Sequence, residues 1–399
     1  MSDAQAPQLP DAAKQRPLLL SLTASIFFVF LDTRVVAALL PTMAKSFDIT
    51  IPRAGLLVSA YMVGYALFQL VYAPVADRVG KIRVVLVTMV IFSVGTFACG
   101  FTTSFGLMIA LRAITGAMGA AVFPMTIAYI GDTVPYDRRQ ATIGMLIAGA
   151  SAANTLSAAS GSFIATIFSW QWVFPVFGIG AAACTVVLYI AARREYRVPA
   201  NKTPALQTYS MAIKHRPLVR LILLSAMEGG LYFGGAAYVS GLFSQRFGMS
   251  TLGIGLLISC LGASQLVSAY VLRRALRWWG EATVLTIGGV LMGAGFCLAA
   301  LMPMWQLEPL AMVTAGFGFT FVHTTLQARA SEALPKSRAT ATTFFSFAVF
   351  ASSGAGTLLA GGLIPQIGYQ NMLISYGCGL FLFTYLVGRF TTPPKPVGI

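Results

Sequence analysis

The chain has 399 residues, of which 57% are hydrophobic and 10% are charged, and its formal net charge is +15. A soluble domain carries about 25% charged residues, so this composition excludes an ordinary soluble protein and indicates that most of the chain lies in a membrane. The positive charge is spread over connectors and forms no basic patch, which argues against nucleic acid as a partner and for membrane lipid.

Apolar runs long enough to cross a bilayer, which takes roughly 20 residues, recur from one end of the chain to the other. They predict twelve membrane helices, at residues 18–40, 54–75, 84–102, 106–129, 141–165, 171–192, 218–241, 252–272, 283–302, 308–328, 340–364 and 371–389. A polar arm, residues 1–17, precedes the first run, and a short tail, residues 391–399, follows the last. The first run is long enough to span, which the apolar part of a signal peptide is not.

The basic residues are distributed unevenly between the two ends of the predicted spans. Most of the 27 lysines and arginines lie at the termini or in connectors that follow even-numbered spans. Lys45, Arg53 and Arg246 lie on the opposite side. Because basic connectors stay in the cytoplasm, this asymmetry predicts an integral protein of the plasma (inner) membrane with both termini cytoplasmic.

A long polar connector, residues 193–217, divides the predicted spans into two groups of six. Landmarks of the first group recur 200 residues later, and Gly80, for example, corresponds to Gly280. The sequence therefore predicts an all-α polytopic membrane protein built from two pseudo-symmetric six-helix halves, residues 18–192 and 218–390. Transporters built from such repeats bind their substrates between the halves, near the middle of the bilayer.

Four ionisable residues lie well inside the predicted spans: Asp32, Arg34, Arg112 and Glu228. A charged group at the centre of a membrane helix costs about 2.5 to 3.5 kcal/mol, so each is a candidate for a functional role. Asp32 and Arg34 are two residues apart and point about 200° away from each other on a helix, so they cannot pair. We predict that Arg112 is the partner of Asp32. We also predict that Glu228 is the partner of Arg34, whereas His323, near the end of the tenth span, is expected to have no special role.

Polar and aromatic residues inside the spans are candidates for the lining of a substrate cavity: Tyr61, Tyr65, Gln69, Asn154, Tyr232, Tyr238 and Gln265. The first three are spaced four residues apart, so they share one face of a helix. For each of these residues, a hydrogen bond to a neighbouring helix explains its presence at least as well as contact with a substrate. The five cysteines lie far apart inside spans and predict neither a disulfide framework nor a metal site.

The connector at residues 73–83 reads APVADRVGKIR, with an acid where a helix ends, a glycine that permits a turn, and basic residues around it. It resembles the loop G-x-L-A-D-R-x-G-R-K that follows the second helix of major facilitator superfamily transporters. The resemblance implies the twelve-helix fold of that superfamily and a cytoplasmic gate that holds helix ends together. The gate residues that we predict are Asp77, Arg78, Gly80, Arg138 and Arg338, with Arg138 as the partner of Asp77. Topology and solubility explain the charges of these connectors equally well.

Two further segments resemble the drug:proton antiporter branch of that superfamily. Residues 31–41 read LDTRVVAALLP, similar to the first-helix motif L-D-x-T-x-V-x-x-A-L-P. Residues 112–116 read RAITG, similar to the fourth-helix motif R-x-x-Q-G, whose arginine is implicated in proton coupling. The resemblance implies proton-coupled efflux of small amphipathic compounds or drugs, with Arg112 in the coupling machinery. We predict that Asp32, which lies in an apolar environment beside an arginine, is the carboxylate that binds and releases the proton. Arg112, Glu228 and Arg34 are predicted to complete the proton-coupling charge relay.

Alternatives to this function follow from the same residues. The fifth span lacks the Gly-Pro motif of the antiporters, so uniport and symport stay open beside antiport. Arg34 and Arg112 would also suit an organic anion, such as a siderophore or a carboxylate. A polytopic enzyme or receptor is the alternative of another class, but the sequence has no metal-ligand cluster and no nucleotide-binding motif. We therefore expect no enzyme and no cofactor, a proton gradient as the energy source, and a monomer that carries a small-molecule substrate.

Overall fold

The computed structural model describes residues 12–193 and 205–390. The predicted tail, most of the predicted N-terminal arm and the middle of the predicted linker lie outside the described residues. The described part of the linker contains a short helix, α9, at Ala205–Lys214. The exact limits of the two halves stay predictions.

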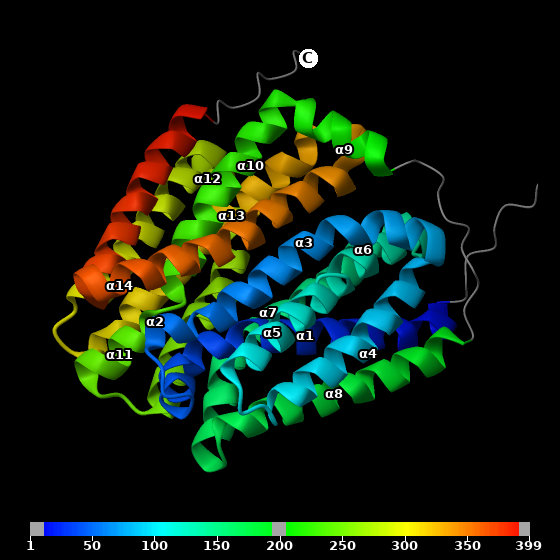
Figure 1. Ribbon diagram of the computed structural model, residues 1–399. Helices are drawn as coiled ribbons and strands as arrows, with labels where there is room; N and C mark the ends of the chain where they lie inside the picture. Colours follow the sequence, from blue (N-terminus) through cyan, green and yellow to red (C-terminus); the bar gives the residue numbers. More distant parts are fainter. Residues whose placement is uncertain (1–11, 194–204, 391–399) are drawn as a thin grey trace, which may run out of the picture.

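Helices make up nearly all of the described chain, and most are joined by short connectors (Figure 1). The first group comprises α1 (Ala12–Ser46), α2 (Ile51–Ala54), α3 (Leu56–Val79), α4 (Lys81–Cys99), α5 (Phe105–Gly119), α6 (Val122–Thr133), α7 (Tyr136–Ile167) and α8 (Trp170–Ala192). The second group, after α9, comprises α10 (Arg216–Ala236), α11 (Val239–Phe247), α12 (Thr251–Leu301), α13 (Glu308–Ala333) and α14 (Arg338–Phe390). Two single turns of 3-10 helix, Trp305–Leu307 and Pro335–Ser337, precede α13 and α14.

These helices correspond to the twelve predicted spans once two kinds of interruption are taken into account. Helices α5 and α6 together form one predicted span, and so do α10 and α11. Helix α12 turns at Gly280 and α14 turns at Gly368, where the backbone has φ angles of 74° and 78°. Each of these two long elements therefore contains two spans. The predicted all-α fold is confirmed, and the twelve spans are found within the described residues.

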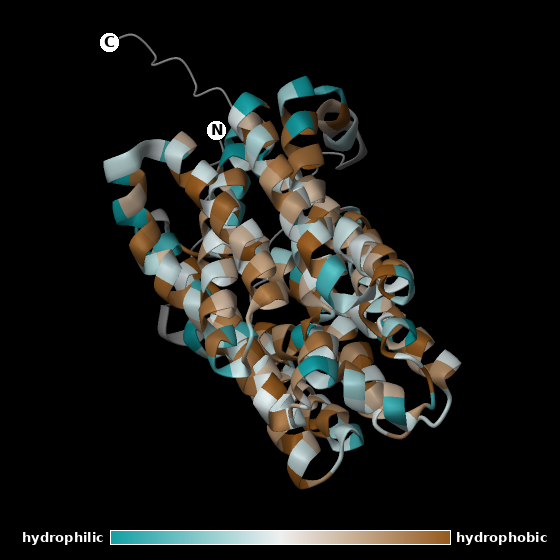
Figure 2. Cartoon of the chain, turned by 90° about the vertical axis from the view of Figure 1, so that its left-hand side faces the viewer, coloured by the Kyte–Doolittle hydropathy of each residue, from teal (hydrophilic) through white to brown (hydrophobic). Residues whose placement is uncertain are grey.

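The surface of the bundle is apolar enough to face lipid. Within the described residues, nine helical stretches are long and apolar enough to cross a membrane, two of them being the double-length α12 and α14. On the peripheral helices α4 and α8, Val94 is 63% exposed and Ile179 is 60% exposed. Figure 2 shows hydrophobic residues along much of the helical length, and hydrophilic stretches at helix ends, including those near the C-terminus. The exposed apolar side chains are those that a bilayer would cover.

The two groups of helices lie side by side and meet along two seams (Figure 1). Within the first group α3 packs against α5 and α4 against α8, whereas α10 packs against α14 in the second. Between the groups, α7 lies against α12 and α3 against α14. A Cβ atom at Gly116 would lie 2.8 Å from the carbonyl carbon of Tyr61, so only glycine lets α5 approach α3 this closely. This close approach places Arg112, one turn earlier on α5, in the interior of the first group.

Gly80, between α3 and α4, has a φ angle of 100° and a ψ angle of 137°, a conformation that side chains with a Cβ rarely adopt. No atom lies within 4 Å of the position that a Cβ would take, so any cost of a substitution comes from the backbone alone. We expect Gly80→Ala to destabilise the protein by about 1–3 kcal/mol in denaturant unfolding experiments in detergent. Gly131→Ala is the matched control, since Gly131 also has open space around it but lies in the regular helix α6. Equal effects of the two substitutions would refute the backbone explanation.

Candidate functional site

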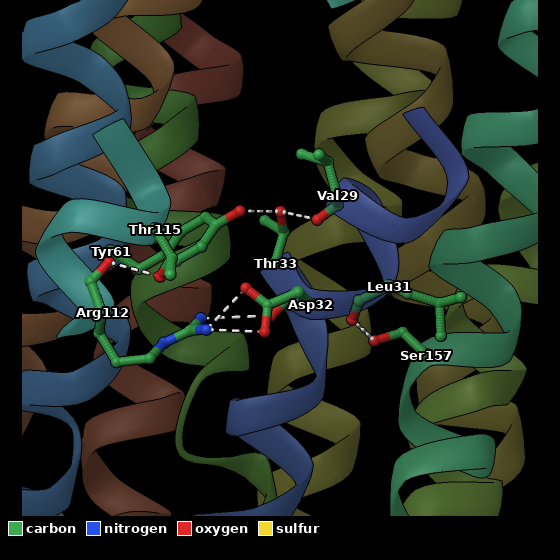
Figure 3. Close-up of polar contacts among 8 residues, drawn as sticks. All are labelled: Val29, Leu31, Asp32, Thr33, Tyr61, Arg112, Thr115 and Ser157. Carbon is green, nitrogen blue, oxygen red and sulfur yellow. Dashed lines mark hydrogen bonds and ion pairs between the residues drawn. The ribbon is translucent and has the colours of Figure 1, made fainter. Parts of the chain in front are cut away.

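A buried ion pair between Asp32 on α1 and Arg112 on α5 lies inside the first group of helices (Figure 3). Arg112 Nη1 donates to both carboxylate oxygens of Asp32, at 2.9 and 2.7 Å, and Nη2 donates to the backbone carbonyl of Asp32 at 3.2 Å. Both side chains are completely buried. This is the pairing that the sequence predicts. Three charge-assisted hydrogen bonds hold the guanidinium in place, and they offset part of the cost of burying two charges.

An aromatic wall encloses the ion pair on the side of α3. The guanidinium carbon of Arg112 lies 4.3 Å from the ring centre of Tyr61, close enough for a cation–π contact. The Tyr61 hydroxyl is 2.9 Å from the Thr33 hydroxyl, which also donates to the Val29 carbonyl at 2.7 Å (Figure 3). Ser157 on α7 donates to the Leu31 carbonyl at 2.6 Å. These contacts fix the turn of α1 that carries Asp32, so the carboxylate cannot move without displacing its neighbours.

Arg34 lies on a different face of α1 and contacts the second group of helices. Its guanidinium carbon is 3.9 Å from the ring centre of Phe233 on α10. The opposite directions of Asp32 and Arg34 agree with the angle expected for residues two apart on a helix. In the described residues, no carboxylate lies within ion-pairing distance of Arg34.

The predicted pairing of Arg34 with Glu228 is therefore wrong. Glu228 on α10 is completely buried, and its Oε1 lies 3.3 Å from Nδ1 of His323 on α13. The His323 ring packs against two aromatic rings, with centroid distances of 4.8 Å to Phe319 and 5.3 Å to Phe345. This contact of His323 with Glu228 was not predicted from the sequence, and the expectation that His323 has no special role stays a prediction. Phe233, five residues after Glu228, occupies the place beside Arg34 that the acid was expected to take.

A cavity, part of it open to solvent, lies between the two groups of helices. Of the seven predicted lining residues, Asn154 on α7, Tyr232 on α10 and Gln265 on α12 line it. Arg34 also lines it, and so does Thr33, the residue that follows Asp32. The cavity is thus separated from the buried ion pair by a single position of α1. Its lining is mostly apolar with a few polar groups, as in sites that bind small organic molecules.

The other four predicted lining residues do not line this cavity. Tyr61 covers the ion pair, and Tyr65 packs across the seam against Phe350, with ring centres 4.1 Å apart. Gln69 is buried within α3. The Tyr238 hydroxyl lies 3.1 Å from the backbone carbonyl oxygen of Pro52 and 3.2 Å from that of Thr357, which share its single hydrogen. For Tyr61, Tyr65 and Tyr238, contact between helices is the explanation that holds.

Several residues that line the cavity could not be predicted from the sequence, because their residue types are common in membrane helices. Phe233, Phe319 and Ser353 line the cavity, together with small and apolar residues of α10 to α13. Phe319 stacks on Tyr232 with ring centres 4.4 Å apart. Phe233 directly follows Tyr232, which was predicted to line the cavity. This position is the one feature of the sequence that could have identified Phe233. Ser353, next to a glycine in an apolar span, resembles an ordinary packing residue.

The predicted gate residues lie at the end of the bundle where α1 begins and α14 ends, but the predicted pair does not form. Arg138 Nε lies 3.8 Å from Oδ2 of its neighbour Asp137, and no ion pair joins Arg138 to Asp77 among the described residues. Both Asp137 and Arg138 are largely exposed at the start of α7, so the adjacent acid is the partner that is available. Asp77, Arg78 and Gly80 lie together at the end of α3, whereas Arg338 begins α14.

Two other ion pairs join helix ends at the same end of the bundle. Lys81, the first residue of α4, contacts Asp132 near the end of α6. In the second group, Arg329 near the end of α13 contacts Glu281 at 2.7 Å, directly after the turn at Gly280. The two pairs occupy corresponding places in the two groups, and their charges are reversed.

Helix α9 touches both groups of helices at this end. The Tyr209 hydroxyl donates to the Leu70 carbonyl of α3 at 3.0 Å, and the Tyr209 ring packs edge-on against Phe344 of α14, 5.3 Å away. Burial, and in addition the nearby carboxylate of Asp77, raises the pKa of Tyr209. The described part of the linker, α9, therefore packs against α3 and α14.

At the opposite end of the bundle, direct hydrogen bonds join the two groups. The hydroxyls of Thr42 on α1 and Thr251 on α12 are 3.0 Å apart. Ser240 donates to the Ala37 carbonyl, and Ser259 accepts from the Ala159 backbone at 3.0 Å. These contacts, with that of Tyr238 to Pro52, hold the two groups together at the end of the bundle where α1 ends and α12 begins.

Comparison with known proteins adds relatives that span the chain. A family model described as the Major Facilitator Superfamily matches residues 22–357. The uncharacterized MFS-type transporter YceJ of Bacillus subtilis is 26% identical over 368 residues, which cover 90% of this chain and 92% of that protein. The efflux pump radE of Floropilus chiversii is 27% identical over 171 residues, 43% of this chain and 32% of the pump. A crystal structure of a bacterial homolog of the human lysosomal transporter Spinster, in an inward-facing conformation, matches with a TM-score of 0.78 at 17% identity, covering 96% of this chain and 98% of that one.

Proposed function

Because the chain belongs to the Major Facilitator Superfamily, we propose that it is a secondary active transporter that works by alternating access and uses the proton gradient. The substrates are small amphipathic organic compounds, and the direction is efflux. The partial similarity to a protein named an efflux pump supports the direction. The mostly apolar lining of the cavity supports the substrate class.

The observation that carries the proton-coupled mechanism is the position of the Asp32–Arg112 pair. The pair is completely buried, yet Thr33 and Arg34, which follow Asp32, line the cavity. A change in the cavity can therefore reach Asp32 through the backbone of a single helical turn. Among the described residues, the Arg112 guanidinium is the only partner of the Asp32 carboxylate, so a proton that binds Asp32 replaces this ion pair.

Protonation of Asp32 would neutralise the carboxylate and weaken its hold on Arg112. The helices α1 and α5 would then be free to adopt another relative position, which is the change that alternating access needs. One proton that crosses 100 mV carries about 2.3 kcal/mol, which is enough to bias such an equilibrium. Glu228, in contact with His323, is the second acidic group of the proposed relay and lies in the other half.

The proposed orientation places both chain termini in the cytoplasm of a cell whose plasma (inner) membrane holds the protein. The end joined by Thr42 and Thr251 would then face outward, and the cavity would be closed to the outside. In this state the transporter would accept its substrate from the cytoplasm, as an efflux protein must. The protein would work as a monomer without a cofactor.

Flux in proteoliposomes tests the function. The purified protein is reconstituted, and uptake of a panel of radiolabelled amphipathic amines, acids and neutral compounds is measured with and without an imposed pH gradient. We expect the pH gradient to accelerate the flux of at least one class of compound. A compound of that class should in turn make the pH gradient collapse faster. Flux that is the same with and without the gradient would indicate uniport and contradict proton coupling. Movement of protons in the same direction as the substrate would indicate symport.

A further inference from the structure

Arg34 is a charged residue that lines the cavity, and the proton-coupling steps proposed above do not involve it. It is the one lining residue with a formal charge in the described part of the chain, and its side chain is partly open to the cavity. Its single described contact is the ring of Phe233, 3.9 Å from the guanidinium carbon. A cation in an apolar cavity without a carboxylate partner is costly, and a transported anion would compensate it.

The acidic groups nearest to the cavity are engaged elsewhere. Asp32 is bound by Arg112 through three hydrogen bonds. Glu228 is completely buried and faces His323 at 3.3 Å. Neither carboxylate is among the residues that line the cavity. The one formal charge on the described lining of the cavity is therefore the positive charge of Arg34.

We propose that Arg34 binds the acidic group of the substrate, so that the transported compounds are organic anions with an apolar or aromatic body. The proposal rests on the transport function argued above and names its substrate class. The contact with Phe233 holds the guanidinium by its face. The N–H groups at its edge stay available for a carboxylate or sulfonate, which a guanidinium binds through two parallel hydrogen bonds.

The rest of the cavity suits such a compound. Asn154 Oδ1 and Ser353 Oγ have no hydrogen-bond partner among the described residues, although both are buried atoms. The Tyr232 hydroxyl accepts from Gln265 Nε2 at 3.4 Å, which leaves its own hydrogen free to donate. Apolar side chains make up most of the remaining lining: Val58, Met62, Ile258, Leu261, Met312 and Phe319. The site thus offers one cation, a few unpaired polar atoms and an apolar wall.

Equilibrium binding to the purified protein in lipid nanodiscs tests the proposal without any gradient. The probes share one aromatic body and differ in charge: naphthylacetate and naphthalenesulfonate as anions, naphthylacetamide as the neutral analogue, and naphthylmethylamine as the cation. The wild type should bind the two anions more tightly than the amide. Arg34→Gln should weaken anion binding about ten- to 100-fold, as expected for the loss of a charged hydrogen bond, and should change amide binding less than about twofold. Arg34→Lys should show an intermediate loss, since lysine keeps the charge but not the planar fork.

Arg53→Gln is the matched control. Arg53 also lies over an aromatic ring, with its guanidinium carbon 5.9 Å from the ring centre of Phe105, but it is exposed and outside the cavity. It should leave the binding of all four probes unchanged. The proposal is overturned if the wild type binds no anion, if it binds the amide or the amine as tightly as the acid, or if Arg34→Gln weakens all probes alike. Gradient-driven flux of amines or neutral compounds without anion binding would overturn this proposal alone and would leave the proposed transport function standing.

Discussion

Replacing Arg112 by alanine is expected to destabilise the protein by about 3–5 kcal/mol, because it leaves the Asp32 carboxylate buried without its cation. Both side chains of the pair are completely buried, and Arg112 provides every described hydrogen bond to the carboxylate. The loss is to be measured by denaturant unfolding in detergent. It should exceed that of Gly80→Ala, which affects only one backbone conformation.

The double variant Asp32→Asn with Arg112→Ala separates the charge effect from the loss of packing. A neutral amide at position 32 should recover much of the stability that Arg112→Ala alone loses, because a buried charge is no longer left unpaired. Equal stabilities of the single and the double variant would show that Arg112 acts by filling space between Tyr61 and Phe174, whose rings it contacts, and not by compensating a charge.

Asp32→Asn by itself is expected to keep the protein inserted and folded but to abolish transport driven by a pH gradient. Asparagine fills nearly the same volume and can still accept hydrogen bonds from Arg112, but it binds no proton at its carbonyl in this pH range. One proton that crosses 100 mV supplies about 2.3 kcal/mol, equivalent to about 50-fold accumulation of a substrate at equilibrium. Gradient-driven accumulation in proteoliposomes should therefore fall from as much as about 50-fold to none, while counterflow, which needs no gradient, persists.

Glu308→Gln provides the control for this experiment. Glu308 is the first residue of α13 and is completely buried, but it does not line the cavity. The substitution changes one buried acid to an amide, as Asp32→Asn does, at a site outside the proposed relay. Retention of gradient-driven accumulation in Asp32→Asn, or its loss in Glu308→Gln alone, would remove Asp32 from the mechanism.

The fold was predictable because its signals are local and physical. Apolar runs fix where a chain can cross a bilayer, and the recurrence of Gly80 at Gly280 marks equivalent turns. The partner of Asp32 was predictable for a similar reason. The angle between Asp32 and Arg34 on one helix excludes their pairing, and Arg112 is the remaining arginine inside a span of the same half.

The rest of the site depended on information that a single sequence does not contain. The two-residue spacing shows that Arg34 points away from Asp32. It does not show which residue of α10 lies opposite Arg34. In the structure that residue is Phe233 and not Glu228. Likewise, the spacing of Tyr61 and Tyr65 shows a shared face, and their rings do stack at 6.3 Å. Whether that face borders a cavity or another helix depends on how the two halves pack, which is set by long-range contacts.

The reversed charges of the two helix-end ion pairs favour correct assembly of the repeated halves. Each half ties the start of its third span to the end of its fourth, through Lys81 and Asp132 in one half and Glu281 and Arg329 in the other. If the third spans exchanged places during insertion, Lys81 would meet Arg329, and Glu281 would meet Asp132. Such like-charge contacts disfavour wrong partners more than an exposed ion pair stabilises the right one. A chain that contains nearly the same bundle twice thus carries, at its helix ends, a signal that distinguishes its two copies while they fold.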